Sequence, residues 1–360
     1  MNFGPEIHTY KGKTIGVYGG KFLPFHKGHL SCILEAQSHV DILFVVVGYD
    51  ELYDKKLCEG TKCNYEPPRI RERWITEELK NFKNIRVLTQ YERRSQNYMK
   101  DDSIYDSYQD LLKRIGGRID KVFSSEPEYT PYFNKYLPMA EHVILNPERS
   151  EFTVSATEIR EKGVYEMWNY LPQAVRDTYV KRIAICGIES VGKSHNAKMA
   201  AKHFDTVYIS EYGRDYYEDL NGFADISLLT DYAAIAVGHV HLMNQKSKGA
   251  NKVAIVDTDL CYTHFFNSLE GNASNPVITN LITEGAEKID LYIFIEPHNE
   301  HELDGTRSPV TDYERVERNK KLKRIYRDYV PSDKFVVVDE ADRVSRFKAI
   351  VNEINKVISK

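Results

Sequence analysis

Two histidines lie close together directly behind the first apolar run of the chain. Residues 19–30 read GGKFLPFHKGHL, in which His26 and His29 are three positions apart at the start of an expected helix and therefore share one face. The N-terminus of a helix adds a positive field and outward-pointing N–H groups. Together these groups suit a triphosphate whose α-phosphorus is attacked while pyrophosphate leaves, because imidazoles can hydrogen-bond the charge that develops.

The neighbours of the two histidines fit the same chemistry. Lys21 would reach the outer phosphates, and Gly19 and Gly20 would let a nucleotide approach the end of the strand. Two other interpretations stay open at this point. A zinc ion could bind the imidazoles, although no convincing third ligand lies nearby in the sequence, or the histidines could be a surface pair with a structural role.

A second glycine-rich loop opens the second half of the chain. Residues 187–194, GIESVGKS, match G-x-x-x-x-G-K-S and lie between the strand-like RIAIC and the helical HNAKMAAKHF. Glycines permit the turn that points N–H groups at phosphates, Lys193 supplies charge to the β- and γ-phosphates, and the Ser194 hydroxyl can bind Mg²⁺. The expected nucleotide-binding positions of this loop are Gly187, Glu189, Ser190, Val191, Gly192 and Ser194.

Carboxylates follow the next long apolar strand of this half. KVAIVDTD ends with Asp257, which is expected to hold the magnesium shell, and with Asp259, which is expected to face a substrate hydroxyl. The segment SEYGRDYYE (210–218) adds Glu211 and Arg214 to the expected substrate site. A kinase needs a carboxylate to accept the proton of the hydroxyl or to orient it, and the residues leave open which of these carboxylates does so.

The segment DGTRS (304–308), followed closely by DYERVERNKKLKRIYRD, has the pattern of a mobile lid. Arg307 would lie in its turn and neutralise the charge on a transferring phosphoryl group. Arg315 and Arg318 on the next helix either join this site or belong to a solvated charged face.

The elements that must position these residues come in two series. Strand-like runs of the first series occupy residues 14–18, 41–48, 84–88, 119–123 and 142–145. Those of the second series occupy residues 181–187, 206–210, 252–257, 291–296 and 334–339. Unbroken apolar runs that alternate with helical patterns predict parallel sheets covered on both faces. We also expect a helix around residues 164–179 between the series and an amphipathic helix, VSRFKAIVNEINKVI, at the end.

The predicted fold class is therefore α/β with two domains, residues 1–176 and 177–360, each a parallel sheet flanked by helices. A chain of 360 residues is too long for one ordinary hydrophobic core, which agrees with this division.

Composition excludes several classes of partner. The formal charge is −4 and the basic residues are spread along the chain, so no nucleic-acid partner is expected. No stretch reaches the ~18 apolar residues of a membrane span, and the N-terminus has no apolar targeting region. The odd number of cysteines fits a reducing cytosol, and we expect a cytoplasmic protein. Cys58 and Cys63 make half a zinc site or belong to a plain loop, and a homo-oligomer stays open.

The first motif resembles the signature of the HxGH nucleotidylyltransferase superfamily. A partner signature of that superfamily, I-S-x-T-x-x-R, is similar to VSATEIR (154–160), with valine in place of isoleucine. The resemblance implies a Rossmann-like first domain and adds Phe22 to the nucleotide-binding positions. It assigns contacts with the phosphates of ATP, opposite the histidines, to Ser155, Thr157 and Arg160.

An adenylyltransferase followed by a phosphate-loop (P-loop) kinase resembles the NadR type of bifunctional enzyme, from about residue 13 to about residue 350. The segments SSEPEY, NPER and PPRIRERW are similar as well. The resemblance implies that Ser124 and Ser125 lie near the adenylate. It also implies that Trp74 stacks on a nicotinamide ring, with Arg73 in the same site, although Trp74 could instead be a core residue.

Some members of this family carry an N-terminal helix-turn-helix repressor domain. Only a dozen residues precede the first expected strand here, so we do not expect DNA-binding repression.

The resemblance implies two consecutive reactions. The kinase half would phosphorylate nicotinamide riboside with ATP and Mg²⁺, and the other half would join the nicotinamide mononucleotide to AMP from a second ATP, giving NAD and pyrophosphate. Two alternatives remain. One is another adenylyl- or cytidylyl-transferring head, such as one acting on pantetheine phosphate, fused to an unrelated small-molecule kinase. The other is a non-enzymatic nucleotide sensor, which predicts damaged motifs in one half.

Overall fold

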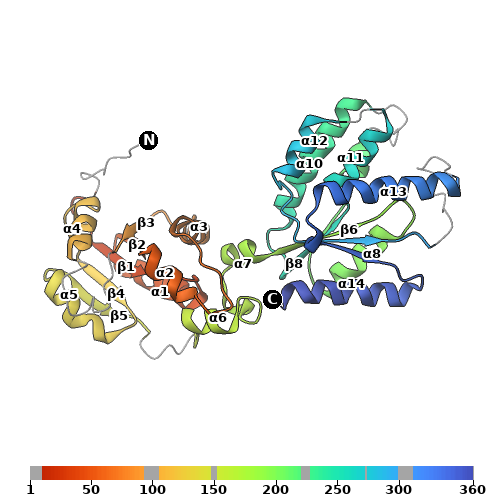
Figure 1. Cartoon of the computed structure of the whole chain (residues 1–360). Helices are drawn as coiled ribbons and strands as arrows, with labels where there is room; N and C mark the ends of the chain where they lie inside the picture. Colours follow the sequence, from red (N-terminus) through yellow and green to blue (C-terminus); the bar gives the residue numbers. More distant parts are fainter. Residues whose placement is uncertain are drawn as a thin grey trace. The chain divides into compact units, whose positions relative to one another are not determined.

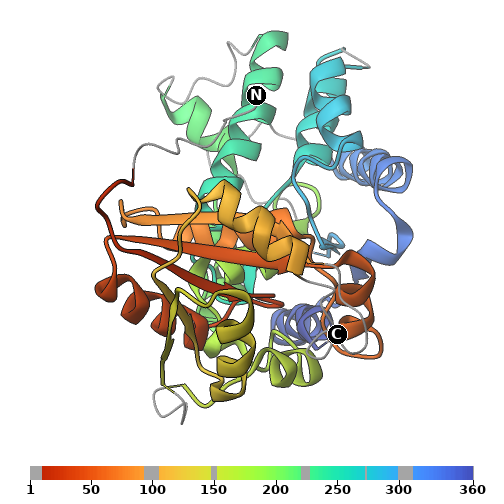
Figure 2. The ribbon, with the colours of Figure 1, turned by 90° about the vertical axis from the view of Figure 1, so that its left-hand side faces the viewer.

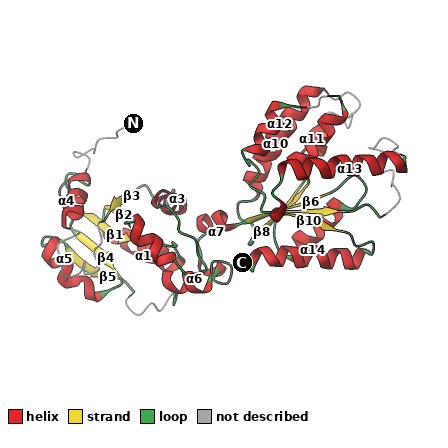
Figure 3. Cartoon of the chain, viewed as in Figure 1, coloured by secondary structure: helices red, strands yellow, loops and turns green. Residues whose placement is uncertain are grey.

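The computed structural model describes residues 10–92, 105–146, 152–219, 228–271, 274–298 and 311–359. The chain divides into two compact units, a first unit that ends at Thr178 and a second unit that begins at Tyr179 (Figure 1). Each unit is an α/β structure of strands and surrounding helices (Figure 3), as the sequence predicts.

The first unit is built on a five-stranded parallel sheet with the strand order β3-β2-β1-β4-β5. Its strands are β1 (Ile15–Gly20), β2 (Ile42–Tyr49), β3 (Ile85–Tyr91), β4 (Lys121–Ser124) and β5 (Glu141–Ile144). Its helices are α1 (Lys27–Ala36), α2 (Glu51–Cys58), α3 (Pro68–Glu78), α4 (Tyr105–Arg114), α5 (Thr130–Tyr136), α6 (Ala156–Lys162) and α7 (Gln173–Tyr179). Figure 2 shows these strands and helices, coloured red to yellow-green, from a second direction.

The core of the first unit follows from the alternation of side chains along its strands. Alternate residues of β1 and β2, such as Val17 and Phe44, pack against Leu111 of α4 and Tyr132 of α5. The other face of the same strands meets α1 and α3. Because both faces are covered, nearly every residue of β2 is buried, which explains the unbroken apolar sequence of that strand.

The second unit is built on another five-stranded parallel sheet, with the strand order β10-β9-β6-β8-β7. Its strands are β6 (Lys181–Cys186), β7 (Tyr208–Ile209), β8 (Val253–Asp257), β9 (Leu291–Ile295) and β10 (Phe335–Val338). Its helices are α8 (Lys193–His203), α9 (Tyr212–Asp219), α10 (Leu229–Lys246), α11 (Leu260–Leu269), α12 (Pro276–Thr283), α13 (Asp312–Tyr329) and α14 (Arg343–Ile358). Helices α8 and α14 cover one face of this sheet, and α10 to α13 lie on the other (Figure 1).

All ten predicted strands are present, which confirms the α/β fold class and its two parallel sheets. One expected helix is wrong in its extent. The segment 164–179 forms a 3₁₀ turn at Trp168–Tyr170 and then a separate helix, α7. Pro172 accounts for the break, because proline disfavours helical geometry at the residue before it and cannot donate an N–H.

Three charged residues around a buried carboxylate join two helices of the first unit to the motif loop. Asp54 of α2 and Arg71 of α3 are both fully buried, and Arg71 Nη2 donates to Asp54 Oδ2 at 2.8 Å. The ammonium of Lys21 pairs with the other oxygen of the same carboxylate. Arg71 Nη1 also donates to the backbone carbonyl of Lys21 at 2.6 Å. One buried carboxylate therefore compensates two cations and fixes the backbone behind the first motif.

None of the described helices is long and apolar enough to cross a bilayer.

The first prediction concerns this buried carboxylate. Asp54→Asn leaves the buried Arg71 and the partly buried Lys21 without an anion, so we expect a loss of about 3–5 kcal/mol in the free energy of unfolding of the first unit. Both tryptophans of the chain, Trp74 and Trp168, lie in the first unit, so denaturation followed by tryptophan fluorescence reports on this unit alone.

Glu51→Gln is the matched control, because Glu51 lies on the same helix in an exposed ion pair with Lys55. Little change is expected there. Equal effects of the two substitutions would contradict the importance of the buried carboxylate.

Candidate active sites

The two histidines of the first motif stack against each other where β1 gives way to α1. Their ring centroids are 3.6 Å apart, with an interplanar angle of 26°. His26 is the N-cap of α1, and the two residues bond reciprocally: His29 N donates to His26 Nδ1 at 3.4 Å, and His26 N donates to His29 Nδ1 at 3.3 Å. This arrangement places both imidazoles on one side of the helix start, as the spacing predicts.

The reciprocal cap also determines the tautomer of each ring. Because both Nδ1 atoms accept hydrogen bonds from backbone amides, the proton of each neutral imidazole resides on Nε2. His26 and His29 therefore present Nε2–H groups as donors. Two donors side by side at a helix N-terminus are suited to binding anionic oxygen.

Two phenylalanine side chains also contact the His29 ring. The ring of Phe22 meets His29 edge to face at 5.0 Å, and the ring of Phe25 stacks on it at 6.1 Å. Phe22 is 1% exposed, so its side chain supports the imidazole instead of offering a surface to a nucleotide. Gly19 differs, because a side chain at this position would meet nothing within 4 Å, which leaves room at the strand end. At Gly20 an added Cβ would lie 3.0 Å from the Phe22 ring.

The second signature of the first unit lies beside the first. Arg160 of α6 is buried and donates from Nη1 to the carbonyl of Leu23 at 2.6 Å, although 137 positions separate them. Its Nη2 donates to Thr157 Oγ1 at 2.9 Å, and Ser155 caps α6 by accepting from Glu158 N at 3.1 Å. The structure thus joins the two motifs through the guanidinium. The Ser155 oxygen accepts the capping bond, which leaves its O–H as a donor.

Ser124 and Ser125 lie at the end of β4, next to β1 in the sheet, where the strand order reverses. Such switch points of parallel sheets are where ligands bind. Ser125 Oγ lies 3.4 Å from Cys32 Sγ of α1, and Ser124 Oγ lies 2.8 Å from His142 Nε2. His142 Nδ1 in turn lies 2.8 Å from Thr130 Oγ1. Burial lowers the pKa of His142, so this imidazole is neutral at physiological pH and orients the Ser124 hydroxyl.

The described geometry changes the roles expected of two residues. Lys21 is 16% exposed at its side chain and is bound to the Asp54 carboxylate, so part of its charge is already compensated. Trp74 is 2% exposed and its Nε1 donates to Thr178 Oγ1 at 2.7 Å. An indole without an accessible face favours the core alternative over stacking on a substrate. Arg73, its neighbour on α3, is exposed.

The two cysteines considered as half a zinc site are free, buried thiols. Burial raises the pKa of both, that of Cys63 to about 11, and Cys63 Sγ contacts the Ile159 carbonyl at 3.4 Å. Within the described ranges no group of three or more His, Cys, Asp or Glu side chains is arranged to hold a metal ion.

The P-loop of the second unit has the geometry that its sequence predicts. It connects β6 to α8, and Gly192, the N-cap of α8, has a φ of 87°. At Gly187 the φ is 138° and an added Cβ would lie 2.8 Å from the carbonyl oxygen of Ile295. Both glycines are thus required by backbone conformation. Gly187 is also required by the close approach of Ile295 at the end of β9.

The side chain of Lys193 folds back onto the P-loop. The residue is buried, its Nζ donates to the carbonyl of Ile188 at 2.9 Å, and the ammonium lies 4.5 Å from the centre of the Tyr262 ring. Ser194 follows it in the first turn of α8. Glu189, in the same loop, pairs with Arg318 of α13 at 3.4 Å, which brings this lid-side arginine to the P-loop.

Asp257 ends β8, which pairs directly with the strand that leads into the P-loop, in register with Ile185. The residue is 1% exposed, and its Oδ2 accepts a 2.8 Å hydrogen bond from the Tyr208 hydroxyl. Its Oδ1 is buried and has no hydrogen-bond partner among the described residues. Burial and then the Asp257 carboxylate raise the pKa of Tyr208, so the phenol stays protonated. An orphaned carboxylate oxygen beside a P-loop fits a divalent cation held by Asp257 and Ser194.

The structure disfavours the substrate role expected of Asp259. This residue is 1% exposed and is the N-cap of α11, where its Oδ1 accepts from Cys261 N at 2.7 Å. Its Oδ2 accepts from Tyr326 at 2.6 Å and from Cys186 Sγ at 3.0 Å. A carboxylate enclosed by these donors stabilises the fold and has no free edge for a substrate. Two carboxylates spaced like Asp257 and Asp259 look equivalent in sequence, and only packing separates them.

The other expected substrate residues lie at the start of α9. Arg214 Nη2 lies 3.8 Å from Glu211 Oε2, and both side chains are partly exposed. Their position after β7 puts them at the same sheet edge as Asp257. Arg307 and the rest of the DGTRS segment lie outside the described residues, as does most of NPER.

Sequence reasoning missed Arg346 of α14. The residue is buried, and it donates to Val191 O of the P-loop at 3.4 Å and to the carbonyls of Glu340 and Ala341 at 2.9 and 3.0 Å. It therefore ties the P-loop to the segment after β10. No local motif announces such a contact, because 155 positions separate its ends.

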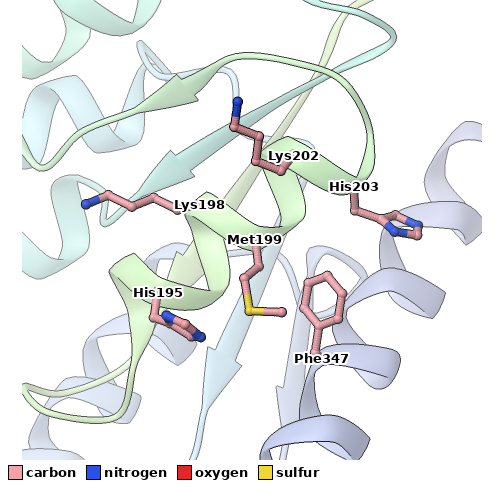
Figure 4. Close-up of a pocket in the computed structure, with 6 residues that line it drawn as sticks. All are labelled: His195, Lys198, Met199, Lys202, His203 and Phe347. Atoms are coloured by element: carbon pink, nitrogen blue, oxygen red, sulfur yellow. The ribbon is translucent and has the colours of Figure 1, made fainter.

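One surface pocket of about 470 Å³ is lined by residues of α8 and α14. Figure 4 shows Met199 of α8 pointing toward Phe347 of α14. The lining residues are His195, Lys198, Met199, Lys202, His203 and Phe347. None of the predicted site residues lines it, so the pocket is not the chemical site.

Comparison with known families and proteins agrees with the two motif sites. Residues 17–162 match the cytidylyltransferase-like family, and residues 182–344 match an AAA domain family. The chain is also similar to two solved structures of NadR, one in complex with NR and one with NAD and AMP-PNP. Their TM-scores are 0.76 and 0.74 at 22% identity, with 97% of both chains covered in each case. These structures show that the two-unit fold is shared.

Sequence similarity extends along almost the whole chain. The trifunctional NAD biosynthesis/regulator protein NadR of Escherichia coli (strain K12) is 33% identical over 349 residues, which cover 96% of this chain and 84% of that protein. Neither unit alone explains a match of this length, since it crosses the boundary at Thr178. The chain belongs to the NadR family.

Proposed function

We propose that this protein is a bifunctional transferase that makes NAD from nicotinamide riboside and two molecules of ATP. The observation that supports it best is the presence of two intact phosphate-binding strand–loop–helix sites in one chain of the NadR family. The second unit phosphorylates the riboside, and the first unit adenylylates the product.

In the second unit, the 5′-hydroxyl oxygen of the riboside attacks the γ-phosphorus of ATP, and the bond to the β,γ-bridging oxygen breaks. The P-loop amides and Lys193 hold the phosphates, and a carboxylate takes the hydroxyl proton. Glu211 is the partly exposed candidate for this base, because Asp259 is enclosed and Asp257 faces the metal position. Bound Mg²⁺ would neutralise phosphate charge, and Asp257 with Ser194 would hold it.

In the first unit, a phosphate oxygen of the mononucleotide attacks the α-phosphorus of the second ATP. The bond to the β-phosphate breaks, and pyrophosphate leaves with the electron pair. The Nε2–H groups of His26 and His29 and the first amides of α1 are the donors for the charge that develops. Arg160 of the second signature steadies the loop of the first motif through its bond to the Leu23 carbonyl.

Both sites meet the requirements of a catalyst, which argues against a non-enzymatic nucleotide sensor. Each unit retains its donor groups in packed geometry: the stacked histidines in one, the loop lysine and strand-end aspartate in the other. We further propose that the protein is cytoplasmic, uses Mg²⁺, and binds neither nucleic acid nor membrane. Its five buried, free thiols support a reducing compartment.

The decisive experiment incubates the full chain with nicotinamide riboside, ATP and Mg²⁺ and identifies the products by mass. NAD, ADP and pyrophosphate are expected. The alternative is that the first unit adenylylates another acceptor. It is tested by offering pantetheine phosphate or other adenylyl acceptors in place of the mononucleotide. Activity with one of these and none with the mononucleotide would refute the assignment of the first unit.

A substitution at the stacked histidines tests adenylyl transfer. His29→Ala removes one preorganised donor, so NAD formation should fall about 100- to 1,000-fold while the mononucleotide accumulates. His39→Ala, at an exposed histidine of the same unit, is the control. An unchanged rate of NAD synthesis would show that the histidine motif has only a structural role.

A substitution in the P-loop tests whether the two activities are separable. Lys193→Ala should lower riboside phosphorylation about 100-fold or more, because a charge that stabilises the transferring phosphate is lost. NAD formation from added mononucleotide should persist, because the first unit has its own core. Lys202→Ala, exposed on the same helix, serves as the comparison. Loss of both activities in a folded Lys193→Ala protein would contradict independent units.

A further inference from the structure

A tyrosine that belongs to no motif touches the carboxylate at the metal position. Tyr208 lies on β7, and its partner in the parallel ladder is Ile255, two residues before Asp257 on β8. Residues two apart on a strand share a face of the sheet, so Tyr208 and Asp257 lie on the same face. The Tyr208 hydroxyl donates to Asp257 Oδ2 at 2.8 Å.

The two oxygens of Asp257 are in different situations. Oδ2 has the phenol as its donor, whereas Oδ1 is buried and accepts no hydrogen bond within the part of the chain that the structure describes. Leaving a charged oxygen buried without a partner is costly, so such an atom marks a place where a cation is expected. Its position beside the strand that enters the P-loop agrees with this.

We propose that Tyr208 is a positioning residue for the Mg²⁺ site of the second unit. The phenol holds Oδ2 and thereby fixes the plane of the carboxylate, with Oδ1 directed at the metal of the nucleotide complex. The proposal rests on the proposed kinase function and adds to it a residue outside the P-loop and the DTD motif. Outer partners of this type commonly change metal affinity about 10- to 100-fold when removed.

The Tyr208 side chain has support of its own. The ammonium of Lys198 on α8 lies 5.4 Å from the centre of its ring. This contact joins the ring to α8 and limits its movement. Tyr208→Phe removes one oxygen and no carbon, which leaves the packing of this ring intact.

The test measures metal binding directly. The full chain with bound ADP is titrated with Mn²⁺, and free Mn²⁺ is followed by electron paramagnetic resonance. Tyr208→Phe is expected to weaken Mn²⁺ binding about 10- to 100-fold and to leave ADP binding in EDTA unchanged. In kinase assays the Mg²⁺ concentration for half-maximal rate should rise by a similar factor, with the rate restored at high Mg²⁺.

Tyr216→Phe is the matched control. Tyr216 also donates to an aspartate, Asp231, at 3.1 Å, in the same unit. Its loss should not change the response to either metal. A double-mutant cycle adds a second measurement: in an Asp257→Asn background, Tyr208→Phe should have no further effect on Mn²⁺ affinity, because the phenol acts through that carboxylate.

Two results would overturn the proposal. Mn²⁺ affinity within twofold of the unsubstituted protein would show that the phenol does not position the carboxylate. A parallel loss of ADP binding in EDTA would show that Tyr208 supports the P-loop fold instead. Neither measurement uses nicotinamide riboside, so failure of the substrate assignment would be seen separately, as absent riboside phosphorylation by a protein that still binds Mn²⁺ and ADP.

Discussion

In a parallel sheet every strand ends at the same edge, and the chemistry of both units depends on this constraint. The central strands β1 and β6 each lead into a tight loop and then a helix, so backbone amides and side chains converge where the strands stop. The same edge then receives Ser124 from β4 in one unit and Asp257 from β8 in the other. Covering both faces with helices makes these edges the natural place for polar groups.

The two edges solve different electrostatic problems with different residues. In the first unit, donors at the helix start are imidazoles whose Nδ1 atoms are committed to the backbone, and the nearby Lys21 shares its charge with Asp54. In the second unit, Lys193 lies within the loop, and Asp257 Oδ1 has no hydrogen-bond partner among the described residues. Under the proposed function, attack at the α-phosphorus would rely mainly on directional hydrogen bonds, and attack at the γ-phosphorus on full charges.

The sequence predicts what is local. Strands, the P-loop and the histidine pair follow from neighbours in the chain, and all ten strands are found where apolar runs predict them. Contacts between distant positions have no such pattern: Asp54 with Arg71, Tyr208 with Asp257, and Arg346 with the P-loop. Burial is equally hard to predict from local sequence. Asp259 is a buried helix cap and Trp74 is a buried indole, although the motifs around them suggested contact with a substrate.

All five cysteines of the chain are free, and all five are buried. A largely buried thiol reacts slowly with alkylating dyes, and the raised pKa values of Cys58 and Cys63 slow it further. The native cysteines are therefore expected to be labelled only slowly by thiol-reactive dyes. A single cysteine introduced on the surface of either unit becomes the dominant attachment point, so fluorophores can be placed on this enzyme without first removing its own sulfhydryls.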